Sequence, residues 1–235
     1  MEKGKLYLIP TIIAEGTAAT VIPHQVVIAL KDIRFFLTEN ARTSRRYLSS
    51  LKIYDSIEAL TFQVLDKDTK EVELATLMAP LLDGYNLGVI SESGCPGIAD
   101  PGSMAVRYAH QHGISVVPLV GPSSILLALM ASGLNGQSFA FHGYLPVDAQ
   151  EAGKKIKELE RESVNKNQTQ LFIETPYRNN QVLDHLLSSL NPASQLSIAL
   201  DLTGSQELIQ TKTVRDWRLN KPTLPKEPAI FSFLA

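Results

Sequence analysis

The chain contains 235 residues, with 22 lysines and arginines against 24 aspartates and glutamates, and it has a single cysteine. Its hydrophobic content of 44% is that of a globular protein, which excludes a disordered chain. The near-neutral charge excludes a protein that coats nucleic acid through its overall charge, and one cysteine excludes an internal disulfide and a multi-cysteine zinc site. No apolar stretch reaches the roughly 20 residues of a membrane-spanning helix, so we expect a cytoplasmic protein without membrane contact.

Short apolar runs alternate with helical patterns in the first half of the chain. Strands are predicted at residues 6–9, 33–37, 85–90 and 114–119. Helices are predicted at residues 18–31, 43–51, 70–82, 104–112 and 123–132. Pro23 is expected to weaken or kink the first turn of the first helix. The helix at 70–82 carries one apolar stripe, and the helix at 123–132 is apolar on every side, which is typical of a buried helix.

The second half of the chain continues the alternation. Strands are predicted at residues 139–144, 171–173, 196–202 and 229–234, and helices at residues 149–162 and 181–190. The first of these two helices is charged and is expected to be exposed. Such alternation predicts an α/β protein in which helices cover a largely parallel sheet. The strands are too many for one flavodoxin-like unit, so we expect two small α/β domains, residues 1–119 and 120–235.

A loop at residues 91–102 directly follows a predicted strand and is rich in glycine, proline and carboxylates. Ligand-binding loops of α/β proteins lie at the carboxyl ends of strands, and glycines let the backbone approach a ligand and expose its N–H groups. The alternative is a long turn that Asp100 caps before the next helix. Cys95 lies in this loop, where we expect it to fill space rather than to react.

A second loop, residues 121–124, also follows a strand and opens an apolar helix. Free N–H groups at a helix start favour an anion or a polar ligand group, but an ordinary serine cap explains the same residues. The fingerprints of the phosphate-binding P-loop, of Rossmann-type dinucleotide binding and of the serine nucleophile elbow are absent. The histidines lack the spacing of a metal site, so no metal is expected.

A basic segment lies on the predicted helix at residues 43–51 and just before it. Arg42, Arg45 and Arg46 are joined by Lys52, with no acidic residue between positions 40 and 52. The segment is either an edge that contacts RNA phosphates or an ordinary solvated helix face.

Residues 89–102, V-I-S-E-S-G-C-P-G-I-A-D-P-G, resemble the signature loop of the tetrapyrrole methylase superfamily. The most similar branch is that of the small-subunit ribosomal RNA (cytidine-2′-O)-methyltransferases. Further segments resemble motifs of that branch in the same order along the chain, namely residues 6–11, 38–46, 117–124, 131–134, 141–146 and 172–178. The resemblance therefore covers most of the chain.

The resemblance implies two α/β domains with a donor cleft between them, S-adenosyl-L-methionine as the methyl donor, and a homodimer. Its motif positions imply donor contacts from Pro10, Glu92, Gly94, Cys95, Ser123, Ser124, Phe172, Glu174 and the backbone near Ala199. A ribose hydroxyl needs help to lose its proton, and Asp100 and Glu39 stand at motif positions from which a general base could act. For Asp100 the alternative is a helix cap.

The chain also departs from the family pattern. The first loop, commonly T-P-I-G-N-L, is T-I-I-A-E-G at residues 11–16, and the triplet D-T-R is N-A-R at residues 40–42. Our first hypothesis is an S-adenosylmethionine-dependent methyltransferase of ribosomal RNA, acting on the ribose 2′-oxygen of a small-subunit cytidine. The alternatives are a methyltransferase of the same fold that acts on a tetrapyrrole or another small molecule, and a donor-binding protein without catalysis.

Overall fold

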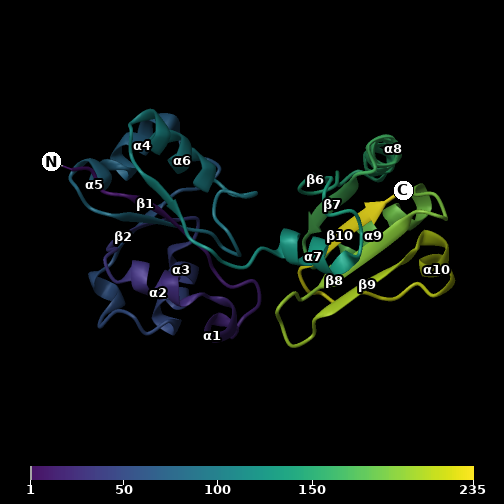
Figure 1. The fold of residues 1–235 in the computed structure, drawn as a ribbon, viewed down its shortest axis with the longest axis horizontal. Helices are drawn as coiled ribbons and strands as arrows, with labels where there is room; N and C mark the ends of the chain where they lie inside the picture. The colour runs from purple at the N-terminus through teal and green to yellow at the C-terminus, as the bar shows by residue number, and fades with distance from the viewer. Residues whose placement is uncertain (1) are drawn as a thin grey trace. The chain divides into compact units, whose positions relative to one another are not determined.

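The structure is a computed structural model that describes residues 2–235. These residues form two compact units, one ending at Ser123 and the other beginning at Ser124. Each unit has its own five-stranded sheet flanked by helices, which confirms the expected α/β class (Figure 1). The boundary expected after Leu119 falls in the segment between β5 (Val116–Pro118) and α7 (Ser124–Ser132).

The first unit is built around a fully parallel sheet with the strand order β3-β2-β4-β1-β5. Its remaining strands are β1 (Leu6–Ile9), β2 (Phe35–Thr38), β3 (Thr61–Val64) and β4 (Leu87–Ile90). Its helices are α1 (Ala18–Val21), α2 (His24–Leu30), α3 (Ala41–Ser50), η1 (Ile57–Ala59), α4 (Glu71–Leu77), α5 (Ala79–Leu82) and α6 (Gly102–Gln111).

Two hydrophobic cores hold this sheet between helices. Helices α4, α5 and α6 cover one face of the sheet, and α2 and α3 cover the other (Figure 1). Their apolar side chains pack against the strands in the two cores. Every residue of β4 is buried, as expected for a central strand covered on both sides.

Two helices predicted as continuous are each broken at a proline. The helix expected at residues 18–31 is α1 and α2, because Ile22 is extended before Pro23, and a residue that precedes proline avoids the helical conformation. The helix expected at residues 70–82 is α4 and α5, because Pro80 lacks an N–H and its ring opposes the preceding turn. Leu74, Leu77, Met78 and Leu81 of the apolar stripe still face the core, whereas Leu82 at its end is exposed.

The second unit contains a mixed sheet with the strand order β6-β7-β10-β8-β9. Its strands are β6 (Phe139–Phe141), β7 (Thr169–Glu174), β8 (Gln195–Leu200), β9 (Leu208–Thr213) and β10 (Ala229–Leu234). Its helices besides α7 are α8 (Ala149–Lys166), α9 (Asn179–Ser189) and α10 (Val214–Leu219). Only β6 and β7 pair in parallel, so the largely parallel sheet expected here is wrong. The sequence patterns also missed β3, β9 and α10.

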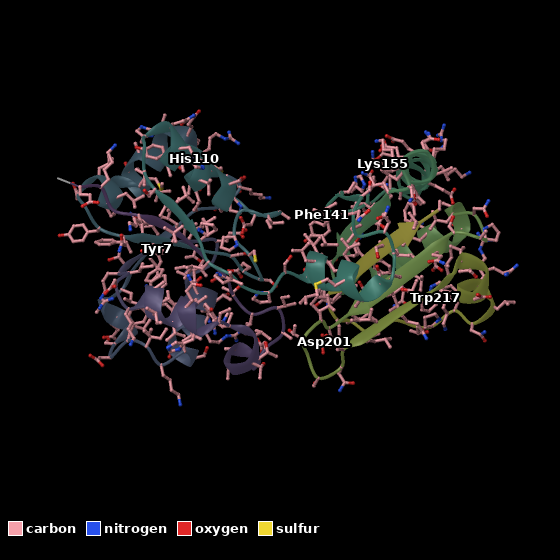
Figure 2. All side chains as sticks on the ribbon, viewed as in Figure 1. Tyr7, His110, Phe141, Lys155, Asp201 and Trp217 are labelled. Atoms are coloured by element: carbon pink, nitrogen blue, oxygen red, sulfur yellow. The ribbon has the colours of Figure 1, made fainter. Side chains whose placement is uncertain are left out.

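The two faces of this sheet carry different side chains. On one face, Phe172, Phe231 and Phe233 pack with α8, α9 and α10. Trp217 of α10, labelled in Figure 2, donates a hydrogen bond to the Leu196 carbonyl at 2.8 Å. On the other face, the small buried residues Ser197, Ala199 and Ser232 leave room for α7, which contacts β8, β9 and β10.

Helix α7 is not the buried helix that its composition predicted. Met130 is 78% exposed and Leu126 is 49% exposed, whereas Ala128, Leu129 and Ser132 are buried. One side of the helix packs on the sheet of the second unit, and its opposite side remains apolar and exposed.

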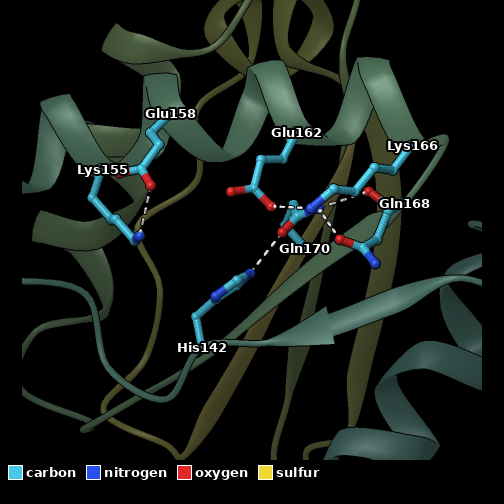
Figure 3. Close-up of polar contacts among 7 residues, drawn as sticks. All are labelled: His142, Lys155, Glu158, Glu162, Lys166, Gln168 and Gln170. Carbon is cyan, nitrogen blue, oxygen red and sulfur yellow. Dashed lines mark hydrogen bonds and ion pairs between the residues drawn. The ribbon is translucent and has the colours of Figure 1, made fainter.

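Helix α8 presents its charged side to solvent, in agreement with its sequence pattern. Ion pairs join Lys155 to Glu158 at 3.2 Å and Lys166 to Glu162 at 2.8 Å (Figure 3). The side chains of His142 and Gln170 form a hydrogen bond of 2.6 Å nearby. Among residues 2–235, no helix is both long enough and apolar enough to cross a membrane.

Candidate functional site

The carboxyl ends of parallel strands meet at one edge of the first sheet. The segments that follow β1, β2, β4 and β5 therefore gather at this edge, where α/β proteins bind ligands. These segments contain seven of the residues selected from the sequence: Pro10, Glu39, Glu92, Gly94, Cys95, Asp100 and Ser123. The tertiary structure thus brings together residues that are far apart in the chain.

The segment after β1 is fastened to the loop after β4. The backbone N–H of Thr11 donates to the Gly94 carbonyl at 2.8 Å, and its hydroxyl donates to the Ser91 carbonyl at 3.2 Å. From α3, the Tyr47 hydroxyl donates to the Pro10 carbonyl at 2.8 Å. Burial raises the pKa of Tyr47, so this hydroxyl remains a donor at neutral pH.

The segment after β5 packs against both of these loops. The Cys95 thiol donates to the Pro122 carbonyl at 3.3 Å. Burial, and then the negative charge of Asp100, raise the pKa of this thiol, so it remains a neutral, space-filling group. Gly121 lies so close to Pro10 that a side chain at position 121 would place its Cβ 2.1 Å from the proline Cβ. Only glycine fits there.

Asp100 organises the loop after β4. Its Oδ1 accepts hydrogen bonds from the N–H groups of Gly97 at 2.6 Å and Gly102 at 2.8 Å. Between these anchors, Ala99 has a φ of +59°, in the left-handed region that non-glycine residues avoid. The geometry therefore supports the turn-stabilising role that the sequence left open for this carboxylate.

Glu39 follows β2 and lines a narrow crevice together with Asp100, Thr38 and Ile90. Burial raises the pKa of Glu39, and the negative charges of Asp100, Glu92 and Asp66 raise it further. Its carboxylate consequently accepts a proton more readily than an ordinary glutamate does.

A cavity of about 470 Å³ lies beside this crevice, within the first unit. Its walls come from the segment after β1, from α1 and α3, and from Ser91 and Glu92. Pockets of roughly 300–1,000 Å³ hold small ligands, and this one is large enough for a nucleoside. Sequence patterns did not identify the cavity, although the altered first loop at residues 11–16 forms part of it.

The three arginines of the basic segment have different surroundings. Arg46 lines the cavity and forms an ion pair with Glu15, with 2.7 Å between Nη2 and Oε1. The Arg45 guanidinium lies over the Phe62 ring, 5.0 Å from its centre. Arg42 is exposed at the first turn of α3, where the Asn40 side chain caps the helix by accepting the N–H groups of Arg42 and Thr43.

The remaining residues selected from the sequence lie in the second unit. Phe172 is fully buried in the hydrophobic core, so its side chain offers no surface to a ligand. Ala199 is buried on the face covered by α7, and Ser124 is the first residue of that helix. Strands β6, β7 and β8 run in the same direction, so Glu174 of β7 lies at the same edge of this sheet as Asp201, which follows β8 and is labelled in Figure 2.

Arg178, the last residue of the motif segment at residues 172–178, lies at this edge but was not selected as a site residue from the sequence. Its guanidinium lies 3.4 Å from Glu174 Oε2, and it donates to the carbonyls of Leu145 and Pro146 at 3.4 and 3.2 Å. Glu174 Oε1 accepts the N–H of Thr175 at 2.7 Å. This largely buried ion pair joins the loops that follow β6 and β7. Within the described part of the chain, no group of three or more histidine, cysteine, aspartate or glutamate side chains is arranged to hold a metal ion.

The fold of residues 2–235 is shared with solved methyltransferases. Uroporphyrin-III C-methyltransferase from Thermus thermophilus superposes with a TM-score of 0.58 and 18% identity, over 98% of this chain and 92% of that one. The methyltransferase CobJ superposes with a TM-score of 0.61 and 17% identity, over 97% and 93% of the two chains. The chain thus has the two-domain α/β fold of the tetrapyrrole methylases.

Sequence relatives indicate which family of methyltransferases the chain resembles. Proteins named ribosomal RNA small subunit methyltransferase I match with 31% identity in Vibrio cholerae, over 87% of this chain and 67% of that protein, and with 33% identity in Streptococcus pyogenes, over 91% and 70%. The Haemophilus influenzae protein of the same name matches with 30% identity, over 95% and 76%. The chain therefore belongs to the ribosomal RNA small subunit methyltransferase I family, which confirms the resemblance found in its motifs. No protein-family model matches the chain.

Proposed function

We propose that this protein transfers the methyl group of S-adenosyl-L-methionine to small-subunit ribosomal RNA, at the ribose 2′-oxygen of a cytidine. Family membership supports the reaction class and the RNA substrate. The observation that carries the proposal is the junction of the segments after β1, β4 and β5, where hydrogen bonds fix the motif loop at residues 91–102. The family's usual acceptor provides the choice of the 2′-oxygen.

The residues at this junction fit the donor chemically. Left-handed Gly94 and Gly97 turn the backbone so that its N–H groups can meet polar atoms of a ligand. The carboxylates that raise the pKa of Glu39 also create a negative region, which favours a positively charged sulfonium or ammonium group. When bound, the donor supplies an electrophilic methyl carbon.

We assign donor binding to Pro10, Glu92, Gly94, Cys95 and Ser123 in the first unit. In the second unit we assign it to Ser124 and Glu174 and, as the motif resemblance implies, to Phe172 and the backbone near Ala199. Glu92 is exposed and is therefore free to accept hydrogen bonds from donor hydroxyl or amino groups.

Methyl transfer is an in-line displacement, so the protein must align the acceptor oxygen with the methyl carbon and exclude water. We assign the general base to Glu39, because its raised pKa favours accepting the proton of a ribose hydroxyl. Asp100 holds the loop and increases the basicity of Glu39. Arg42, Arg45 and Arg46 provide positive charge for RNA phosphates, and Arg46 is the one that lines the cavity.

Two measurements test the proposal. Calorimetry with S-adenosylhomocysteine should show binding in the micromolar range, and no binding at high micromolar ligand would exclude a donor site. Transfer of radiolabelled methyl groups to 30S subunits from a strain that lacks the family's enzyme should then occur. Donor binding without transfer to 30S subunits would favour a regulator, and transfer to uroporphyrinogen instead would favour a small-molecule enzyme.

We also propose that the protein acts as a homodimer in the cytoplasm, where ribosomal RNA is modified. The usual state of the family supports the dimer. Light scattering after size-exclusion chromatography should give twice the mass of one chain, and a mass equal to one chain would contradict the dimer.

A further inference from the structure

An exposed ion pair that contributes little to stability lies at the rim of the 470 Å³ cavity. Glu15 extends from the segment after β1 and Arg46 from α3, and their side chains are 82% and 73% exposed. Ion pairs that are this open to water contribute little to stability because solvent screens the charges. Nevertheless, the pair holds a guanidinium at the mouth of the cavity and blocks its charge with a carboxylate.

The interior of the cavity is preformed. Three of its lining residues, Thr11, Ser44 and Tyr47, are buried, and their hydroxyls form hydrogen bonds with neighbouring protein groups, namely the Ser91 carbonyl, the Thr38 hydroxyl and the Pro10 carbonyl. Ile12, Ile13 and Ile90 add apolar wall. A largely apolar pocket of this volume, with hydroxyls held in place by hydrogen bonds, suits a flat heterocycle such as a nucleobase, and sequence-specific RNA recognition commonly takes unstacked bases into such pockets.

The cavity also lies next to the proposed chemistry. Glu92 of the motif loop at residues 91–102 lines it, and Ile90 lines both the cavity and the crevice that contains Glu39 and Asp100. The Thr38–Ser44 hydrogen bond joins a wall of the crevice to a wall of the cavity. A base held in the cavity would therefore keep its ribose close to Glu39.

We propose that this cavity receives a nucleotide of the RNA substrate, and that Glu15 competes with a phosphate of that RNA for Arg46. The inference rests on the proposed function, since it names the place where the RNA enters. Arginine binds phosphate through paired N–H donors, and a phosphate that replaces the Glu15 carboxylate would use the same face of the guanidinium. Glu15 thus limits the affinity for RNA and admits only substrates that displace it.

The test breaks the same ion pair from its two sides. If the ion pair only fixes the first loop, E15Q and R46Q must change the KM for 30S subunits in the same direction. Competition predicts opposite directions: R46Q should raise the KM for 30S subunits about tenfold and reduce the salt dependence of RNA binding by about one phosphate contact, whereas E15Q should lower the KM about threefold. The affinity for S-adenosylhomocysteine should be unchanged in both. R107Q, which removes an exposed arginine from α6 on the opposite face of the sheet, is the matched control and should leave the KM unchanged.

A second variant tests the cavity itself. I13W should fill it and abolish methylation of 30S subunits while the affinity for S-adenosylhomocysteine remains that of the wild type. Shifts of E15Q and R46Q in the same direction, or normal methylation by a folded I13W, would overturn this inference and leave the proposed function standing. A wild-type protein that binds S-adenosylhomocysteine but methylates no 30S subunits would overturn the proposed function, and this inference with it.

Discussion

Replacing Asp100 with asparagine separates the structural role of this carboxylate from a catalytic one. Its Oδ1 accepts hydrogen bonds from the N–H groups of Gly97 and Gly102, and these bonds hold Ala99 in the left-handed region. Asparagine keeps an acceptor oxygen at the same position but carries no charge. We therefore expect D100N to fold and to retain most of its affinity for S-adenosylhomocysteine.

The stability cost follows from the two hydrogen bonds of Asp100. A hydrogen bond to a charged group contributes about 1.5–3 kcal/mol, and one between neutral groups about 1 kcal/mol. Because Asp100 is partly exposed, the lower end of the first range applies. The free energy of unfolding in urea should fall by about 1 kcal/mol in D100N and by about 3 kcal/mol in D100A, which loses both bonds.

The lost charge also acts on Glu39. After burial, Asp100 is the largest cause of the raised pKa of Glu39, so D100N should lower that pKa. Glu39 accepts a proton only when it is ionised, and activity therefore rises with pH through its pKa. The acid limb of the pH–rate profile should move to lower pH in D100N, and less in E92Q, because Glu92 has a smaller effect. An acid limb that stays in place, or an inactive D100N that binds S-adenosylhomocysteine normally, would refute this reasoning.

Three further predictions concern residues that follow the strands of the first sheet or of the second. E39Q should lose most methyl transfer and gain stability at neutral pH, because the folded-state pKa of Glu39 is raised above its ordinary value of 4.5. This gain in stability should disappear as the pH falls through the folded-state pKa to 4.5, and equal stability of E39Q and wild type at pH 7 would contradict the prediction. G121A should lose donor binding by calorimetry and about 1–3 kcal/mol of stability in urea, since its Cβ would overlap Pro10; normal donor affinity would show that the junction adapts. R178M should lower the free energy of unfolding by about 3 kcal/mol, because it leaves Glu174 buried without its partner. The double variant R178M/E174Q should recover part of that loss, and no recovery would show that the ion pair is not the cause.

Several features of the fold could be predicted locally, and several could not. Most of the buried strands, and the helices α3, α6, α8 and α9, were predicted from their patterns because their burial is encoded in nearby residues. Strand β9 was missed because it lies at the edge of its sheet and its sequence, L-I-Q-T-K-T, includes polar side chains that an edge strand can expose. The break before Pro80 was missed because the apolar stripe continues through it, although the missing N–H is a purely local property.

The exposure of α7 shows a different limit. Its composition is apolar on every side, and burial was the natural expectation. The packed side is set by contacts with β8, β9 and β10, strands far along the chain whose buried residues on this face include the small Ser197, Ala199 and Ser232. Met130 remains on the other side and is exposed.

The sequence by itself determined the class of fold, the family and the segments that carry the chemistry, because motif loops and apolar periodicity depend on residues close together in the chain. Only the tertiary structure decided what those residues do to each other. Asp100 raises the pKa of Glu39 because two parallel strands end side by side, and electrostatic effects depend on distance in space rather than in sequence. In the same way, the cavity exists only where the first loop, α3 and the motif loop at residues 91–102 meet. Its Glu15–Arg46 ion pair could not be recognised from the sequence, because the two residues are far apart in the chain.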